Sequence, residues 1–291
     1  MENRFKPYLM IMPVMIIIMG IFILGLFMGL LQSLGYFKAI GLTEITLDYY
    51  KEVLSSKDFL SSLGFSLYVS IVSSLIAVVL GIVLAYSIVQ RKGKGRLAEV
   101  IFKIPISVPH IVAVLLVYNI LSQSGILPRL LYALGLIRDS SSFPSLIYDR
   151  RGIGIMITYL WKEIPFVAMV VYTVLDNINE RLTEVALNLG ASRRQAFFHV
   201  ILPLILPSAF SAFIIIFAFS FGAYEVPFLL GPTTPKTLPV KAYVEYINPN
   251  FANRPYAMVI NMIVTFICLG LVWLYFKAFK WISKYTGDFN G

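Results

Sequence analysis

Six long apolar stretches constrain this chain more than any other feature of its sequence. They cover about residues 8–31, 63–90, 104–122, 154–176, 205–229 and 257–280. An α-helix needs about 20 mostly apolar residues to cross a bilayer, and lipid offers no partner to an unpaired backbone group. Charged residues make up only 13% of the chain, whereas an ordinary soluble domain holds about 25%. The pattern therefore predicts an all-α integral membrane protein with six transmembrane helices.

The polar segments between these stretches leave no room for a large soluble domain. We expect an N-terminal span with an outer segment at residues 1–60, and a membrane core at residues 61–285. The first apolar stretch is too long for a signal-peptide core and no small-residue cleavage site follows it, so we expect it to stay as a span. The single cysteine, Cys268, excludes a disulfide framework and a cysteine-based metal site.

Basic residues indicate the orientation of the chain in the membrane. The densest group lies between the second and third stretches and consists of Arg91, Lys92, Lys94, Arg96 and Lys103. Cytoplasmic loops carry an excess of lysine and arginine, so we place this loop and both termini in the cytoplasm. The asymmetry summed over all loops is modest, because the segment between the third and fourth stretches also carries arginines. The net charge of +9 fits anchoring to anionic lipid rather than binding to nucleic acid, since the basic residues adjoin apolar spans.

Proline and glycine predict breaks in two of the spans. Pro105 and Pro109 weaken the helix at the start of the third span, because proline lacks the N–H group that a helix needs. Gly222 and Pro227 interrupt the fifth span near its outer end. Broken helices in transporters expose polar groups toward the transport path. The proline-rich segment 231–256 that follows is predicted to be an outer loop, and residues 36–62 are predicted to hold a short amphipathic helix.

Two charged residues, Lys162 and Glu163, lie inside the fourth apolar stretch. A charge inside a membrane helix costs ~2.5–3.5 kcal/mol on insertion scales, so such residues face the bundle interior or a water-filled path. Alternatively, Lys162 extends outward to the interface and Glu163 pairs locally. We take Glu163, with Tyr224, Glu225 and Asn119, as candidates for the lining of a translocation path.

A polar stretch between the fourth and fifth spans predicts a short helix that ends in a sharp joint. Leu182, Val185, Ala186 and Leu189 follow the i, i+3, i+4, i+7 spacing of one apolar helical face. Gly190 comes directly after them, and glycine is the residue that ends a helix in the left-handed conformation without a Cβ clash. The joint is therefore expected at Gly190.

A second short helix is predicted directly after the joint. Ser192 and Gln195 have the spacing of a capping box, in which each side chain bonds to the backbone N–H of the other residue. Pro203 and Pro207 then limit regular hydrogen bonding. Together the two helices form a polar loop that ends at Pro203.

This loop resembles the EAA loop of membrane permeases in binding-protein-dependent ABC importers. The family pattern is Glu-Ala-Ala, three residues, Gly, nine residues and Ile-x-Leu-Pro. Val185 replaces the first alanine, at the second position of the pattern, and Val200 replaces the isoleucine; the resemblance covers about residues 60–280. The positions that match are Glu184, Ala186, Gly190, Leu202 and Pro203.

The resemblance implies the permease subunit of a bacterial importer with six core helices, located in the inner membrane. Residues 61–285 would form the transport core, with a cytoplasmic coupling loop at 180–203. The implied partners are two ATPase chains, which hold ATP and Mg, a second permease that is a copy or a paralogue, and an external solute-binding protein. This chain would be no enzyme and would bind no cofactor itself. The residues implied in ATPase contact are Glu184, Ala186, Gly190, Ala191, Leu202 and Pro203.

The sequence is compatible with more than one substrate and more than one class of transporter. The chain looks most like permeases of the polyamine, ferric-ion, sulfate and molybdate branch. Two acids near aromatic residues favour a polyamine-like organic cation, whereas basic outer loops favour an oxyanion such as sulfate, molybdate or a phosphonate. A different class is an ion-coupled secondary transporter, with Glu163, Glu225 and His110 as its relay. A membrane-embedded enzyme is a third possibility, which no catalytic constellation in the sequence supports.

Overall fold

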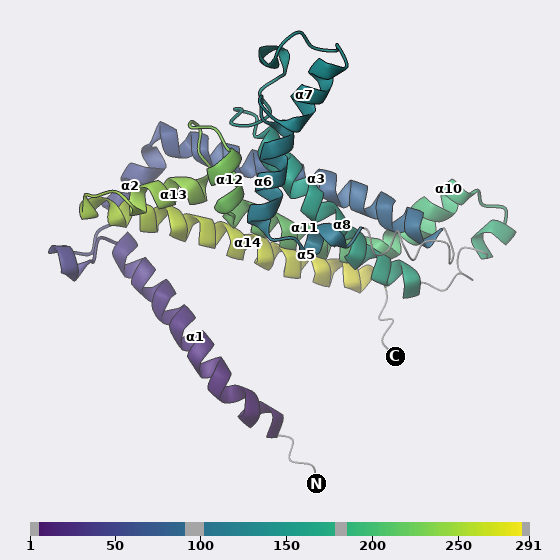
Figure 1. Ribbon diagram of the computed structural model, residues 1–291. Coiled ribbons are helices and arrows are strands. Elements are labelled where there is room, and N and C mark those ends of the chain that lie inside the picture. The colour runs from purple at the N-terminus through teal and green to yellow at the C-terminus, as the bar shows by residue number, and fades with distance from the viewer. Residues whose placement is uncertain (1–5, 91–101, 178–184, 287–291) are drawn as a thin grey trace. The chain divides into compact units, whose positions relative to one another are not determined.

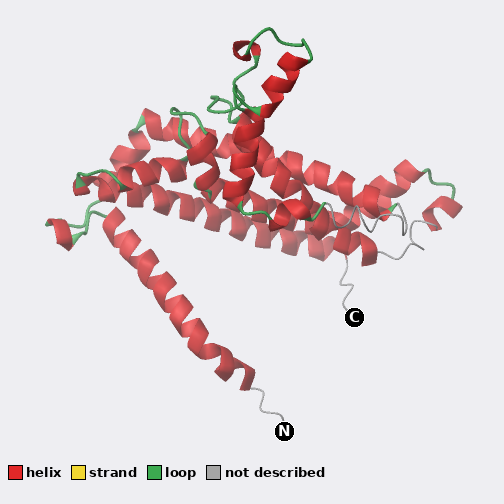
Figure 2. Cartoon of the chain, viewed as in Figure 1, coloured by secondary structure: helices red, strands yellow, loops and turns green. Residues whose placement is uncertain are grey.

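The computed structural model describes residues 6–90, 102–177 and 185–286, and within them the chain is built from helices joined by loops and turns (Figures 1 and 2). The longest helices are α1 (Lys6–Ser33), α3 (Lys57–Val89), α8 (Ile153–Asn177), α11 (Leu202–Gly222) and α14 (Arg254–Thr286). The shorter helices are α2 (Asp48–Ser55), α5 (Ile104–Ser107), α6 (His110–Leu121), α7 (Ile126–Ala133), α10 (Arg193–Ala196), α12 (Glu225–Leu230) and α13 (Leu238–Tyr246). Single 3-10 turns lie at Lys38–Ile40, Ser140–Ser142 and Phe251–Asn253.

Six helical segments in the described part of the chain are long and apolar enough to cross a membrane. This confirms the predicted fold class. The third segment reaches further than predicted, because α7 continues it beyond the short turn after α6. The segments are Tyr8–Ser33, Lys57–Val89, His110–Ala133, Ile153–Asp176, Arg193–Gly222 and Phe251–Lys277.

The chain divides into two compact units, of which the first joins residues 1–60 to residues 238–266. In this unit every large apolar side chain of α1 from Tyr8 to Met28 is exposed. In a bilayer such a surface lies against lipid or against another apolar helix. The predicted amphipathic helix of the outer segment is present as α2, which buries Val53.

The predicted outer loop 231–256 is partly wrong, because it contains the helix α13. Pro239 is the second residue of this helix. Proline is tolerated in the first turn, where a helical N–H group has no partner in any case. In the first unit, α13 is tied to the start of α3 by an ion pair between Lys241 and Asp58.

The second unit, residues 61–237 with 267–291, holds the main apolar core. In it α3, α8 and α11 pack through small residues, including Ala85, Ala168 and Ala212, all of which are buried. Small side chains let helix backbones approach closely, and in lipid such packing supplies most of the association energy. A second cluster joins α3, α6, α8 and α12 around Ile155 and Leu230.

Both predicted helix breaks are present in this second unit. The third span is divided between α5 and α6 at Val108 and Pro109. The fifth span is divided between α11 and α12, where Ala223 and Tyr224 are not helical. The breaks leave carbonyl groups without their usual helical partners, and such groups need another donor when they are buried.

The second helix of the polar loop is not a separate short helix, which corrects the prediction. α10 continues through a π-helical turn at Phe197–Ile201 directly into α11. The wider turn precedes Pro203, whose ring would clash with a carbonyl four residues earlier in a regular helix. The loop therefore delivers its second helix straight into the fifth span.

Candidate functional site

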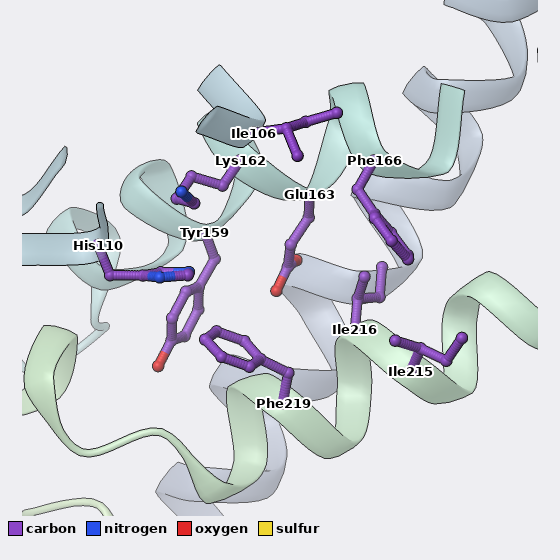
Figure 3. A pocket seen from close by; sticks show the side chains of 9 residues that line it. All are labelled: Ile106, His110, Tyr159, Lys162, Glu163, Phe166, Ile215, Ile216 and Phe219. Atoms are coloured by element: carbon purple, nitrogen blue, oxygen red, sulfur yellow. The ribbon is translucent and has the colours of Figure 1, made fainter. Parts of the chain in front are cut away.

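In the second unit, α5, α6, α8 and α11 surround a cavity of about 210 Å³ (Figure 3). Its wall is mostly apolar and aromatic, with Glu163 and Lys162 as its charged residues. The break in the third span brings the end of α5, with Ile106, and the start of α6, with His110, to this wall. The lining residues are Ile106, His110, Tyr159, Lys162, Glu163, Phe166, Ile215, Ile216 and Phe219.

Glu163 points its carboxylate into this cavity and toward Phe219, with Tyr159 on one side and Ile216 on the other (Figure 3). The residue is 4% exposed. The hydroxyl of Ser220 on α11 donates to its Oε1 atom. The other oxygen, Oε2, is buried and has no hydrogen-bond partner. The carboxylate is thus held through one oxygen, while its other oxygen is buried and unpaired.

Lys162, the neighbouring charge, is 9% exposed and does not extend to the membrane interface. Its Nζ donates to the carbonyl of Pro105 at 3.1 Å and to the carbonyl of Val108. A cation is favourable at the C-terminal end of a helix, where unpaired carbonyls carry partial negative charge. Lys162 therefore ties the end of α5 to α8, and the expectation that it reaches outward is wrong.

His110 lies at the start of α6 and packs on an aromatic ring. The His110 and Phe219 ring centroids are 4.7 Å apart, with the rings tilted by 33°. Tyr159 is buried and its hydroxyl donates to the carbonyl of Ser220 at 3.4 Å. These contacts join α6, α8 and α11 around the cavity.

The four path candidates predicted from sequence are not all brought together. Only Glu163 lines the cavity. Tyr224 precedes α12 and stacks on Phe228 with 4.9 Å between ring centroids. Glu225 is exposed at the first position of α12. Asn119 is exposed on α6, and its side-chain amide donates to the carbonyl of Leu115 at 2.8 Å.

Sequence reasoning missed the partners of Glu163. Tyr159 and Phe166 stand four residues before and three residues after it on α8, so helical spacing could have placed them on one face. Ser220 and Phe219 come from α11, more than 50 residues away in the chain. No local signal could assign these two to the cavity, because their place depends on how α8 and α11 pack.

The joint of the polar loop has the predicted geometry. Gly190 has φ +87°, the left-handed conformation. Its N–H donates to the carbonyl of Leu187 at 3.0 Å, and the N–H of Ala191 donates to the carbonyl of Ala186 at 3.0 Å. These two bonds form a Schellman motif, which closes the end of a helix. The helix end is therefore shaped by its own backbone.

The capping box that starts the second helix is also present. The N–H of Ser192 donates to Oε1 of Gln195 at 2.8 Å, and the N–H of Gln195 donates to Oγ of Ser192 at 3.3 Å. Only one residue, Ala191, separates the closed first helix from this cap. The angle between the two helices is thus set by Gly190, Ala191 and Ser192.

Apolar side chains at the joint are exposed. Leu189 is 82% exposed and Val185 is 53% exposed. Among the other residues of the motif, Ala186 and Ala191 are half-buried, and Leu202 and Pro203 lie at the start of α11. Glu184 lies outside the described residues. Exposed apolar side chains on a polar loop are typical of a contact surface for another protein.

A family model described as "Binding-protein-dependent transport system inner membrane component" matches residues 77–279. Among curated proteins, the spermidine/putrescine transport system permease protein PotB of Haemophilus influenzae is 27% identical over 164 residues, which are 56% of this chain and 55% of that protein. The probable ABC transporter permease protein YurN of Bacillus subtilis is 24% identical over 96% of this chain and 97% of its own length.

A solved structure has a similar fold. One chain in a bacterial alginate ABC transporter, in complex with an alginate pentasaccharide-bound periplasmic protein, matches 94% of this chain and 96% of its own length. The TM-score is 0.74 and the sequence identity is 22%. At this identity the likeness concerns the fold.

Proposed function

Because the chain belongs to the family of binding-protein-dependent transport system inner membrane components, the permease subunits of ABC importers, we propose that it forms part of a translocation path and couples that path to ATPase subunits through residues 180–203. The family is one of membrane permeases and not of enzymes. Membership of a binding-protein-dependent transport family disfavours the alternative of an ion-coupled secondary transporter, which the sequence had left open.

The observation that carries the coupling proposal is the rigid, exposed joint around Gly190. Its backbone is closed by the Schellman motif and the capping box, while Leu189 stands 82% exposed. Apolar anchors on a shaped surface supply much of the energy of protein contacts. The proposed partner at this surface is an ATPase dimer that holds ATP and Mg, and Glu184 is proposed to take part in the contact.

The continuity of α10 with α11 supports a mechanical role for this loop. A displacement of the joint is passed along one helix into the fifth span, which lines the cavity through Ile215, Ile216 and Phe219. We expect ATP-driven closure of the ATPases to shift the equilibrium between two arrangements of the spans, one facing inward and one facing outward.

The remaining partners and the orientation complete the proposal. We propose that a second permease, a copy or a paralogue, supplies the other half of the path, and that a solute-binding protein delivers solute from outside. We further propose that both termini lie in the cytoplasm of a bacterium and that the six long apolar helices cross its membrane. Tyr224, Glu225 and Asn119 stay candidates for the outer part of the path.

For the solute we propose a polyamine-like organic cation. The buried carboxylate of Glu163 among aromatic rings supports it, and the relative PotB is named for spermidine and putrescine. A second candidate is an oxyanion, which is favoured by the exposed Arg129 and Arg151 in the predicted outer segment. An anion would have to pass the buried acid.

The test of the coupling proposal is a pair of substitutions at Gly190. Nothing lies within 4 Å of a Cβ atom at this position, so backbone conformation alone decides the outcome. Gly190→Val is strained at φ +87°, whereas Gly190→Asn is tolerated because asparagine adopts the left-handed conformation. We expect Gly190→Val to misdirect α10 and to lower ATPase retention and solute-stimulated ATP hydrolysis by about tenfold, for a strain of about 1.4 kcal/mol.

The measurement is co-purification of the ATPase in detergent, followed by ATP hydrolysis in reconstituted vesicles. Gly190→Asn is expected to behave like the parent protein in both assays. Equal insertion of all three proteins in the membrane is the control. If Gly190→Val keeps parental ATPase retention and stimulated hydrolysis, the loop is not the coupling element.

A further inference from the structure

The cavity on α8 contains an acid whose second oxygen has no partner. Oε1 of Glu163 accepts the Ser220 hydroxyl, while Oε2 is buried without a hydrogen bond. Leaving a buried charged acceptor unpaired is costly, so such a group is paired in at least one state of the protein. Figure 3 shows the carboxylate turned away from the Lys162 ammonium.

The positive groups around the cavity do not supply that partner. The ammonium of Lys162 donates to the carbonyls of Pro105 and Val108 at the end of α5. The His110 ring lies against Phe219 instead. The two described ion pairs, Lys51–Asp48 and Lys241–Asp58, belong to the other compact unit. None of these described groups donates to Oε2 of Glu163.

The walls specify what kind of donor fits. Tyr159, Phe166 and Phe219 present aromatic rings, and Ile215 and Ile216 complete an apolar lining. Aromatic faces attract cations, and apolar walls accept the methylene groups of a chain. A cavity of about 210 Å³ holds on the order of seven water volumes, enough for an ammonium head with a short alkyl chain.

We propose that this cavity is a subsite for one primary alkylammonium group, which pairs with Glu163 when the carboxylate turns Oε2 into the cavity, while its chain lies among Tyr159, Phe166 and Phe219. The ammonium supplies the missing donor and balances the buried charge. The proposal rests on the function proposed above, since it makes the cavity a binding site on the path of the transported solute. Lys162 serves the site by holding α5 in place, because its ammonium donates to the Pro105 and Val108 carbonyls and not to Glu163.

The experiment uses the full chain purified from membranes with its co-purifying subunits in lipid nanodiscs. The probe is n-butylammonium, and binding is measured by calorimetry with protein-free nanodiscs subtracted. 1-Butanol and butyrate are the neutral and anionic probes of the same chain length. We expect binding of butylammonium alone, and Glu163→Gln should weaken it by roughly 10- to 100-fold, the value of one charge-assisted hydrogen bond.

The matched control is Glu44→Gln, which removes an exposed acid in the other unit. It should bind butylammonium like the parent protein. A second measurement on the unmodified protein needs no folded variant: binding should weaken as the pH is lowered, because protonation removes the carboxylate. Equal binding of 1-butanol, parental binding by Glu163→Gln, no binding by the parent protein or pH-independent binding would each overturn the proposal.

These outcomes are separable from failure of the importer function. If ATPase retention and its dependence on Gly190 are normal while butylammonium does not bind, the subsite is wrong and the importer stands. If butylammonium binds through Glu163 while Gly190→Val keeps full coupling, the subsite stands and the coupling loop is wrong.

Discussion

Gly81 shows how one residue controls the approach of two helices in the second unit. A Cβ atom at this position would lie 2.7 Å from Cβ of Val167 and 3.1 Å from the carbonyl oxygen of Ile164. Both neighbours belong to α8, and the backbone atom has no rotamer with which to move away. Gly64, on the same helix α3, has nothing within 4 Å of such an atom. The two glycines form a matched pair.

We predict that Gly81→Ala separates α3 from α8 and lowers the free energy of unfolding by about 1–3 kcal/mol, the usual cost of overpacking. Gly64→Ala should be neutral or stabilise by up to ~1 kcal/mol, because alanine favours the helix. Thermal unfolding of the two variants in the same detergent measures the difference. Equal midpoints would mean that the contact between α3 and α8 is not close.

At the scale of elements, the short helix α5 depends on a side chain from α8. Lys162 supplies donors to the Pro105 and Val108 carbonyls, which the helix break leaves unpaired. We predict that Lys162→Met, which keeps the length of the side chain, costs about 1–3 kcal/mol of stability by leaving buried acceptors unsatisfied. Lys162→Arg should recover part of the loss, because it restores the charge and the donors.

Thermal unfolding of the two variants provides the measurement. Since Lys162 also lines the cavity, butylammonium binding is measured beside it. A displaced α5 would lower binding in Lys162→Met, whereas a lysine that merely repelled the cation would raise it. Parental stability in Lys162→Met would rule out the proposed tie between α5 and α8.

At the scale of the whole molecule, the orientation in the membrane determines which loops an ATPase can reach. The predicted topology places Lys94 in the cytoplasm and Lys236 outside. We expect Lys236→Cys, in a Cys268→Ser background, to react with a membrane-impermeant maleimide in intact spheroplasts. Lys94→Cys should react only after the membrane is opened. Labelling of Lys94→Cys in intact spheroplasts would invert the topology and move the loop 180–203 away from any cytoplasmic ATPase.

The features that follow from local chemistry were all predictable from sequence. Six apolar stretches give six spans because lipid leaves no other way to satisfy the backbone. Gly190 and the pair Ser192–Gln195 form their joint because these motifs are closed by bonds within a few residues. The breaks near Pro109 and Gly222 are local as well, because proline lacks the N–H group that a helix needs and glycine lacks the side chain that restricts the backbone.

Which polar groups meet depends on how distant helices pack against one another. Glu163 was a candidate from its charge alone, but its bond to Ser220 depends on the packing of α8 against α11. Lys162 turned inward because α5 ends beside it with two unpaired carbonyls, a neighbour that its own helix does not reveal. Tyr224, Glu225 and Asn119 do not line the cavity, which their own sequence neighbours also could not reveal. Contacts between distant segments are set by how whole helices pack, and this packing cannot be predicted from a residue's sequence neighbours.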